Sequence, residues 1–126
     1  MTRTFIATAL LALAVPAAAE GKVRWFHSPT GNIECEVAAN DSRGTYAYCQ
    51  TFNPTESVKL NAAGTSKVCV GGNCVGDGPE NAFTLHYGDA VRIGPFRCTS
   101  RTSGMTCRVV GKGRGFVISR SGVRRF

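Results

Sequence analysis

The amino-acid sequence predicts a small, disulfide-stapled, all-β protein assembled from antiparallel hairpins. Short runs of β-branched and aromatic residues alternate with clusters of Gly, Asn, Asp and Ser, which is the pattern of strands and turns. No long stretch repeats apolar residues with the 3.6-residue period of a helix. The 126 residues include six cysteines, an even number that is typical of a disulfide framework in a short exported chain. A barrel and a sandwich both fit such a set of strands.

The first 19 residues have the features of a signal peptide. Arg3 supplies a positive charge, an apolar run of 11 residues starts at Phe5, and small residues suit a cleavage between Ala19 and Glu20. About 20 apolar residues are needed for a helix to span a bilayer, so a retained membrane anchor is the weaker interpretation. We therefore expect one exported domain, residues 20–126, without a transmembrane span, in the periplasm or the medium.

Strand register pairs the cysteines inside three hairpins. Each expected turn lies midway between two cysteines, which places them opposite each other in neighbouring strands. The turns are centred on Asp41-Ser42-Arg43, Gly71-Gly72 and Thr102-Ser103, and the predicted disulfides are Cys35–Cys49, Cys69–Cys74 and Cys98–Cys107. Six cysteines allow 15 connectivities, so register alone does not exclude the others. The closest pair has four residues between its members and no histidine nearby, which favours disulfides over a metal site, and we predict no metal and no cofactor.

The same registers sort apolar from polar side chains, as a sheet buried on one side requires. In the first hairpin one face carries Ile33, Cys35, Val37, Ala47, Cys49 and Thr51, and the other carries Glu34, Glu36, Tyr46, Tyr48 and Gln50. In the third hairpin the apolar face carries Phe96, Cys98, Ser100, Met105, Cys107 and Val109. Further strands are predicted at Val23–His27, Phe83–His86, Ala90–Ile93 and Phe116–Arg120, and residues 52–66, with Pro54 and Gly64, are predicted to form a surface loop.

Several short segments of the sequence have a distinctive pattern of residues. They are FHSPTGNIEC at 26–35, LHYG at 85–88, FRCTS at 96–100 with SGMTC at 103–107, and GRGFVISR at 113–120. In these segments the chain resembles a family of small exported bacterial proteins of uncharacterised function. The resemblance implies export, six cysteines and a bacterial origin, and it supplies no catalytic residue. The chain departs from the family most in residues 52–76, and Arg114 stands where many members have histidine.

Charge is distributed unevenly along the chain. Residues 91–126 contain nine Lys and Arg and no acid, whereas residues 20–90 contain five Lys and Arg and eight Asp and Glu. A basic half predicts an anionic partner, although a merely solvated basic face is the more common arrangement. Exported proteins meet anionic envelope polymers, lipid head groups and acidic glycans, and no aromatic-rich basic motif indicates nucleic acid.

Five basic residues are the candidate anion ligands. The predicted register puts Arg97 directly opposite Arg108, where two like charges repel. Continuing the sheet is expected to bring Arg120 near Thr106. Lys112 and Arg114 lie in a Gly-rich stretch whose backbone amides suit an anion nest. We therefore predict a non-enzymatic binding module that uses Arg97, Arg108, Lys112, Arg114 and Arg120.

Other interpretations remain open at this point. Tyr46 and Tyr48 on the face away from the core suit a ligand platform, although a covering strand or loop is the commoner reason for such aromatics. A hydrolase of envelope polymers would draw on Glu34, Glu36 or His86. No nucleophile elbow, zinc-protease or phosphate-loop motif is present, so we predict no catalytic residue. A secreted inhibitor or structural protein that binds another protein also fits the sequence.

Overall fold

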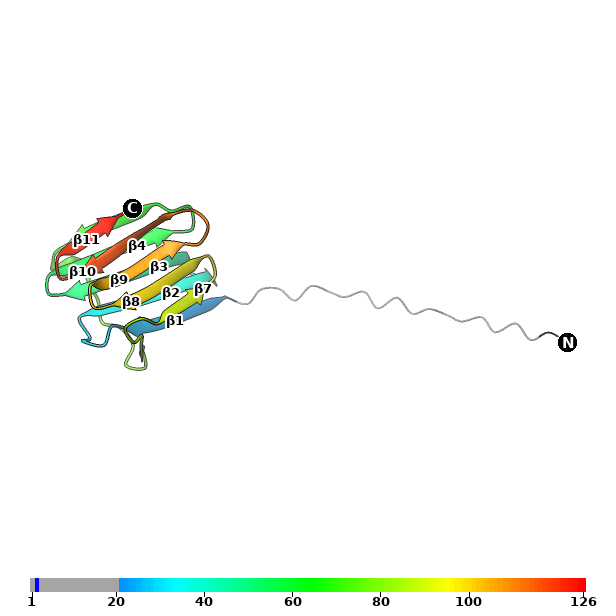
Figure 1. Cartoon of the computed structure of the whole chain (residues 1–126), viewed down its shortest axis with the longest axis horizontal. Helices are drawn as coiled ribbons and strands as arrows, with labels where there is room; N and C mark the ends of the chain where they lie inside the picture. Colours follow the sequence, from blue (N-terminus) through cyan, green and yellow to red (C-terminus); the bar gives the residue numbers. More distant parts are fainter. Residues whose placement is uncertain (1, 3–20) are drawn as a thin grey trace.

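The protein is a two-layer β-sandwich. The structure, a computed structural model, describes residue 2 and residues 21–126, so the predicted signal peptide and its cleavage point lie outside the described residues apart from Thr2. Within the described residues, no helix is both long and apolar enough to cross a membrane. Figure 1 shows the two sheets stacked face to face, and neither closes into a barrel. The all-β prediction is confirmed, and of the two predicted architectures the sandwich is the one formed.

Sheet A contains six strands in the order β5-β4-β3-β2-β1-β6. Neighbouring strands are antiparallel, except that the short strand β6 runs parallel to β1. The strands are β1 (Lys22–His27), β2 (Ile33–Asp41), β3 (Gly44–Phe52), β4 (Thr55–Asn61), β5 (Ser66–Val70) and β6 (Phe83–Thr84).

Sheet B contains five antiparallel strands in the order β11-β10-β9-β8-β7. They are β7 (Ala90–Ile93), β8 (Phe96–Arg101), β9 (Gly104–Val109), β10 (Arg114–Ser119) and β11 (Gly122–Arg125). Strand β10 packs across β3 and β4, and β7 packs across β1 and β2. The basic C-terminal part of the chain therefore forms one complete layer of the sandwich.

The core fills the space between the two layers. Period-2 alternation turns one face of every central strand inward, and three phenylalanines, Phe26, Phe96 and Phe116, are completely buried there. The predicted faces are confirmed, because every residue assigned to the apolar face of the first and third hairpins is buried. Each sheet thus presents its other face outward, and these two outer faces are the surfaces available for binding.

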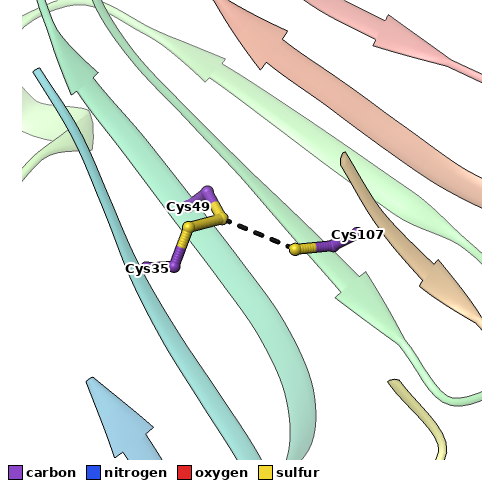
Figure 2. Close-up of side chains that lie close together, drawn as sticks. All are labelled: Cys35, Cys49 and Cys107. Atoms are coloured by element: carbon purple, nitrogen blue, oxygen red, sulfur yellow. Dashed lines mark hydrogen bonds between the residues drawn. A yellow bond between two sulfur atoms is a disulfide. The ribbon is translucent and has the colours of Figure 1, made fainter. Parts of the chain in front are cut away.

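All three predicted disulfides are formed, and no cysteine is free within residues 21–126. Two of them are buried and meet across the core, where the Sγ atoms of Cys49 and Cys107 lie 3.8 Å apart (Figure 2). Both sulfurs are already oxidised, so neither carries a proton and the contact is van der Waals packing. The sulfurs of Cys35, Cys49 and Cys107 lie within 4.8 Å of one another, but their disulfides leave no thiolate for a metal.

The predicted turn at Gly71-Gly72 is wrong, although the disulfide that it was meant to explain exists. Strand β5 pairs with β4 and ends at Val70, and residues Gly72–Cys74 form a short 3-10 turn. Only Gly71 has a positive φ, 113°, whereas a type I′ hairpin needs two such residues. Cys69 and Cys74 are bridged because this turn brings their Cα atoms within 5.5 Å.

The predicted surface loop at 52–66 is also wrong, because Thr55–Asn61 forms strand β4 between β3 and β5. Val58 and Leu60 face the core there, and Lys59 and Asn61 face outward. The predicted strand Ala90–Ile93 is confirmed as β7, and the other strand predictions differ at the ends. The predicted strand Phe83–His86 extends only over Phe83–Thr84, Phe116–Arg120 is replaced by Arg114–Ser119, and β11 was not predicted.

The two-residue turn at Thr102-Ser103 is confirmed by the pairing of Arg101 with Gly104. In the first hairpin the Cys35–Cys49 register is confirmed, but a bulge between Ala38 and Asp41 shifts the pairing before the turn. Asn40 has a φ of 55° in this bulge, a conformation that asparagine tolerates better than most residues. The bulge shortens the turn to Ser42-Arg43, because Asp41 pairs with Gly44.

Candidate functional site

A row of arginines crosses the outer face of sheet B. The register pairs Arg92 with Arg97 and Arg97 with Arg108, so the three side chains stand beside one another on β7, β8 and β9. All three are exposed, because Ile93, Cys98 and Cys107 take the inward positions. Like charges directly opposite each other in neighbouring strands are destabilising, so the row costs stability in the free protein.

The arginine hollow is a depression of about 360 Å³ beside this row. It is lined by Arg97, Arg101 and Arg108, and its remaining walls are Gly88, Thr99, Thr106 and Phe126. No Asp or Glu lines it. Among residues 21–126, the ion pairs are those that Arg43 makes with Glu36 and Asp41 on the other sheet. The three guanidinium groups of the arginine hollow therefore have no carboxylate partner in the described part of the chain.

On β10, the position directly opposite Arg108, next to the arginine row, is occupied by Gly115. A Cβ atom at this position would overlap the carbonyl oxygen of Cys107 and approach the backbone of Arg108. On its other side Gly115 exchanges two backbone hydrogen bonds with Phe126, both 3.0 Å long. Glycine therefore lets β10 lie close beside β9 and leaves the face next to Arg108 open.

Lys112 and Arg114 lie apart from the arginine hollow. Arg114 begins β10, where it pairs with the inward-facing Val109. It packs against the β4–β5 turn so closely that a Cβ on Gly64 would lie 2.9 Å from two of its side-chain carbons. Lys112 donates a hydrogen bond from Nζ to the carbonyl oxygen of Ala62, 3.3 Å away. Both residues therefore contact sheet A at the edge of the sandwich, away from Arg97 and Arg108.

Arg120 does not lie opposite Thr106, since Val117 takes that position. Instead it lies in the turn between β10 and β11 and lines a small cleft at the end of the sandwich. Arg101 lines both this cleft and the arginine hollow. The other polar walls of the cleft include Ser28, Thr30 and Asn32, from the segment between β1 and β2.

The outer face of sheet A has a different character, with Glu36 at the centre of a bonded cluster. Tyr46 donates a hydrogen bond to Oε1 of Glu36, and Arg43 forms an ion pair with the same oxygen at 3.0 Å. The guanidinium of Arg43 also lies 5.8 Å from the centre of the Trp25 ring. Burial, and then the Glu36 carboxylate, raise the pKa of Tyr46 to about 12.

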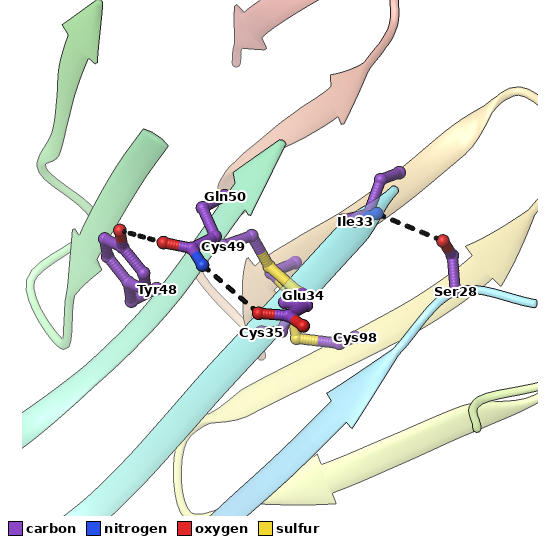
Figure 3. The surroundings of a disulfide bond; sticks show 9 residues. Ser28, Ile33, Glu34, Cys35, Tyr48, Cys49, Gln50 and Cys98 are labelled. Carbon is purple, nitrogen blue, oxygen red and sulfur yellow. Dashed lines mark hydrogen bonds between the residues drawn. A yellow bond between two sulfur atoms is a disulfide. The ribbon is translucent and has the colours of Figure 1, made fainter. Parts of the chain in front are cut away.

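A strap formed by residues 71–82 covers part of this face. Gln50 holds it by donating to the carbonyl oxygen of Gly76 and accepting from the Gly76 amide at 3.0 Å. The Tyr48 hydroxyl lies 2.9 Å from the carbonyl oxygen of Cys74, and burial raises its pKa. Figure 3 shows Tyr48, Gln50 and Glu34 joined in a chain of hydrogen bonds above the Cys35–Cys49 disulfide.

These contacts show where the residues named in two other interpretations of the sequence lie. Tyr46 is buried and Tyr48 is half-buried under the strap, so the two rings do not form an open platform. Glu34 and Glu36 both line a cavity beneath the strap, but the exposed His86 is not among its lining residues. The three residues named for a hydrolase are therefore not gathered in one site.

Arg92 and Arg101 were not among the predicted site residues, although period-2 alternation contains the signal for both. Arg101 is four residues from Arg97 on the same strand and so shares its face. Arg92 alternates with Val91 and Ile93, and it pairs with Arg97 through the short Gly94-Pro95 turn. The alternation of Trp25 with the buried Phe26 likewise places Trp25 on the outer face, beside Glu36.

Comparison with known proteins identifies a family for this chain. Residues 53–126 match a family of unknown function, DUF6636. This match includes β4 to β11, and so it contains the whole of sheet B and the arginine hollow. No curated protein and no solved structure matches the chain. Because the match covers more than half of the 126 residues, the protein belongs to the DUF6636 family of unknown function.

Proposed function

We propose that this protein is an exported, non-enzymatic binding module that holds an anionic partner on the outer face of sheet B. The observation that carries the proposal is the arginine hollow, which Arg97, Arg101 and Arg108 line together without an Asp or Glu. A phosphate or carboxylate group there would relieve the repulsion between the paired arginines and accept hydrogen bonds from them. The neighbouring Thr99 and Thr106 add hydroxyl donors.

Two features of the chain support an envelope setting. Three disulfides suit an oxidising compartment outside the cytosol, and the sequence of residues 1–19 suits export. Polymers that carry repeated phosphate or carboxylate groups are the anionic ligands of that compartment that best match an extended basic sheet. The groups reach the protein along the open side of sheet B, and Arg101 connects the hollow to Arg120 at the end of the sandwich.

The experiment is sedimentation of the oxidised protein with purified bacterial cell-envelope fragments. We expect binding at about 20 mM salt and loss of binding at about 500 mM salt, because the Debye length falls from about 20 Å to about 4 Å. Arg97→Gln with Arg108→Gln is expected to weaken binding at least about ten-fold, since charge-assisted hydrogen bonds are lost together with the charges.

The matched control is Lys59→Gln with Lys67→Gln. These lysines are also directly paired across two strands, but on the outer face of sheet A. The control removes the same net charge, and we expect it to weaken binding only about two-fold. Equal weakening by both double variants would show that net charge alone drives association. Absence of binding at low salt would leave the arginines as a solubilising surface and would overturn the proposal.

A further inference from the structure

The strap and sheet A enclose a second, independent cavity, on the opposite side of the sandwich from the arginine hollow. Its volume is about 150 Å³, a size at which a benzene-sized molecule fits. Trp25 and Tyr48 supply aromatic walls, and Pro79 and Ala82 of the strap supply apolar ones. The charged residues that line it are Glu34, Glu36 and Asp77, and no Lys, Arg or His is among the lining residues.

Within residues 21–126, Glu34 and Asp77 are the lining carboxylates without an ion pair, and of these Glu34 is half-buried whereas Asp77 is exposed on the strap. Glu36 is already neutralised by Arg43 and bonded by Tyr46. Glu34 accepts a single side-chain hydrogen bond, from Nε2 of Gln50 at 3.2 Å, and it forms no ion pair with any residue of 21–126. A half-buried carboxylate with aromatic side chains beside it is an arrangement that favours an organic cation over a hydrated metal ion.

Gly78 keeps this carboxylate accessible. The strap passes so close to Glu34 that a Cβ at residue 78 would lie 2.9 Å from Oε2 and 3.4 Å from Cδ. A larger residue would therefore displace or cover the carboxylate. The strap itself is fixed, because Gln50 bonds both polar backbone groups of Gly76 and the Cys69–Cys74 disulfide closes its base. The cavity is therefore already formed in the free protein, so a ligand does not have to order its walls.

We propose that this cavity binds a small organic ammonium ion, with its charge on Glu34 and its apolar body against Trp25 and Tyr48. The chain provides an internal precedent on the same face, where the guanidinium of Arg43 lies between the Glu36 carboxylate and the Trp25 ring. The ligand class is an alkylammonium of about six or seven non-hydrogen atoms, which matches the cavity volume. This site is separate from the arginine hollow and does not depend on the function proposed for it.

Trp25 is the only tryptophan in the chain, so its fluorescence reports directly on the cavity. The probe is choline, and the control ligand is 3,3-dimethylbutan-1-ol, which has the same shape without the charge. We expect choline to change Trp25 emission saturably and the alcohol to bind at least about ten-fold more weakly. The indole N–H resonance of Trp25 in an NMR spectrum measures the binding of the same two ligands and requires no variant.

The variant that tests the carboxylate is Glu34→Gln, which retains an acceptor for Gln50. We expect it to weaken choline binding at least about ten-fold, whereas Glu80→Gln, on the exposed side of the strap, is expected to leave binding unchanged. Equal binding of choline and the alcohol, or unchanged binding by Glu34→Gln, would overturn the proposal. So would the absence of any saturable Trp25 signal up to about 20 mM choline.

Discussion

Removing the Cys98–Cys107 disulfide should destabilise the protein by about 4 kcal/mol. The bridge closes a loop with a sequence separation of 9, for which the chain-entropy term is about 2.5 kcal/mol. Both cysteines are completely buried, and Cys107 meets Cys49 of the other sheet at 3.8 Å. Cys98→Ala with Cys107→Ala therefore also removes two packed atoms from the centre of the core, which adds about 1.5 kcal/mol.

The matched comparison is Cys69→Ala with Cys74→Ala. This bridge has a sequence separation of 5 and lies at the exposed base of the strap, so only its entropy term of about 2 kcal/mol applies. The assay is equilibrium urea unfolding of both double variants without reductant, after mass spectrometry has confirmed that the two remaining bridges are formed. Equal losses of stability in the two variants would refute the idea that the sulfur contact between the sheets contributes packing energy.

Two further predictions concern single side chains of sheet A. Glu56 is 8% exposed and its Oε1 has no hydrogen-bond partner among the described residues. Glu56→Gln is therefore expected to raise the free energy of unfolding by about 1 kcal/mol. The control Glu80→Gln is expected to leave the free energy of unfolding nearly unchanged. The pKa of Tyr46, about 12, exceeds the usual value of 10, so the folded protein holds this proton more tightly and loses stability as the pH rises from 10 to 12. The absorbance titration of the wild type minus that of Tyr46→Phe should be centred near pH 12, and a midpoint near 10 would contradict the burial of this hydroxyl.

Much of the fold could be predicted because its strands obey local rules. Cys35 with Cys49 and Cys98 with Cys107 could be paired from alternation alone, since a slip of one residue would turn every core side chain outward. Strand β4 could not be recognised, because Pro54 and Gly64 at its borders resemble loop signals although Val58 and Leu60 alternate correctly. Strand β11 is short and basic, so it has little apolar pattern to reveal it.

Strand register predicted only part of the candidate site. Arg97 and Arg108 are opposite each other because one hairpin fixes both. Arg120 lies away from Thr106, and Lys112 and Arg114 contact sheet A, because these positions depend on where β10 starts and on how the two sheets meet, which are tertiary contacts with no local signal. The cavity under the strap was not foreseen for the same reason, since Gly76 and Gly78 reach Gln50 and Glu34 only after the chain has left sheet A and returned.

The disulfides join consecutive cysteines in chain order, first with second, third with fourth and fifth with sixth, at separations of 14, 5 and 9 residues. An oxidase that acts on the thiol pairs in chain order would therefore make only native bonds. Each bond also lies within a segment that ends before the next pair appears, so no earlier bond has to be broken when a later one forms. Oxidation in chain order thus reaches the native pairing without rearrangement of any earlier bond.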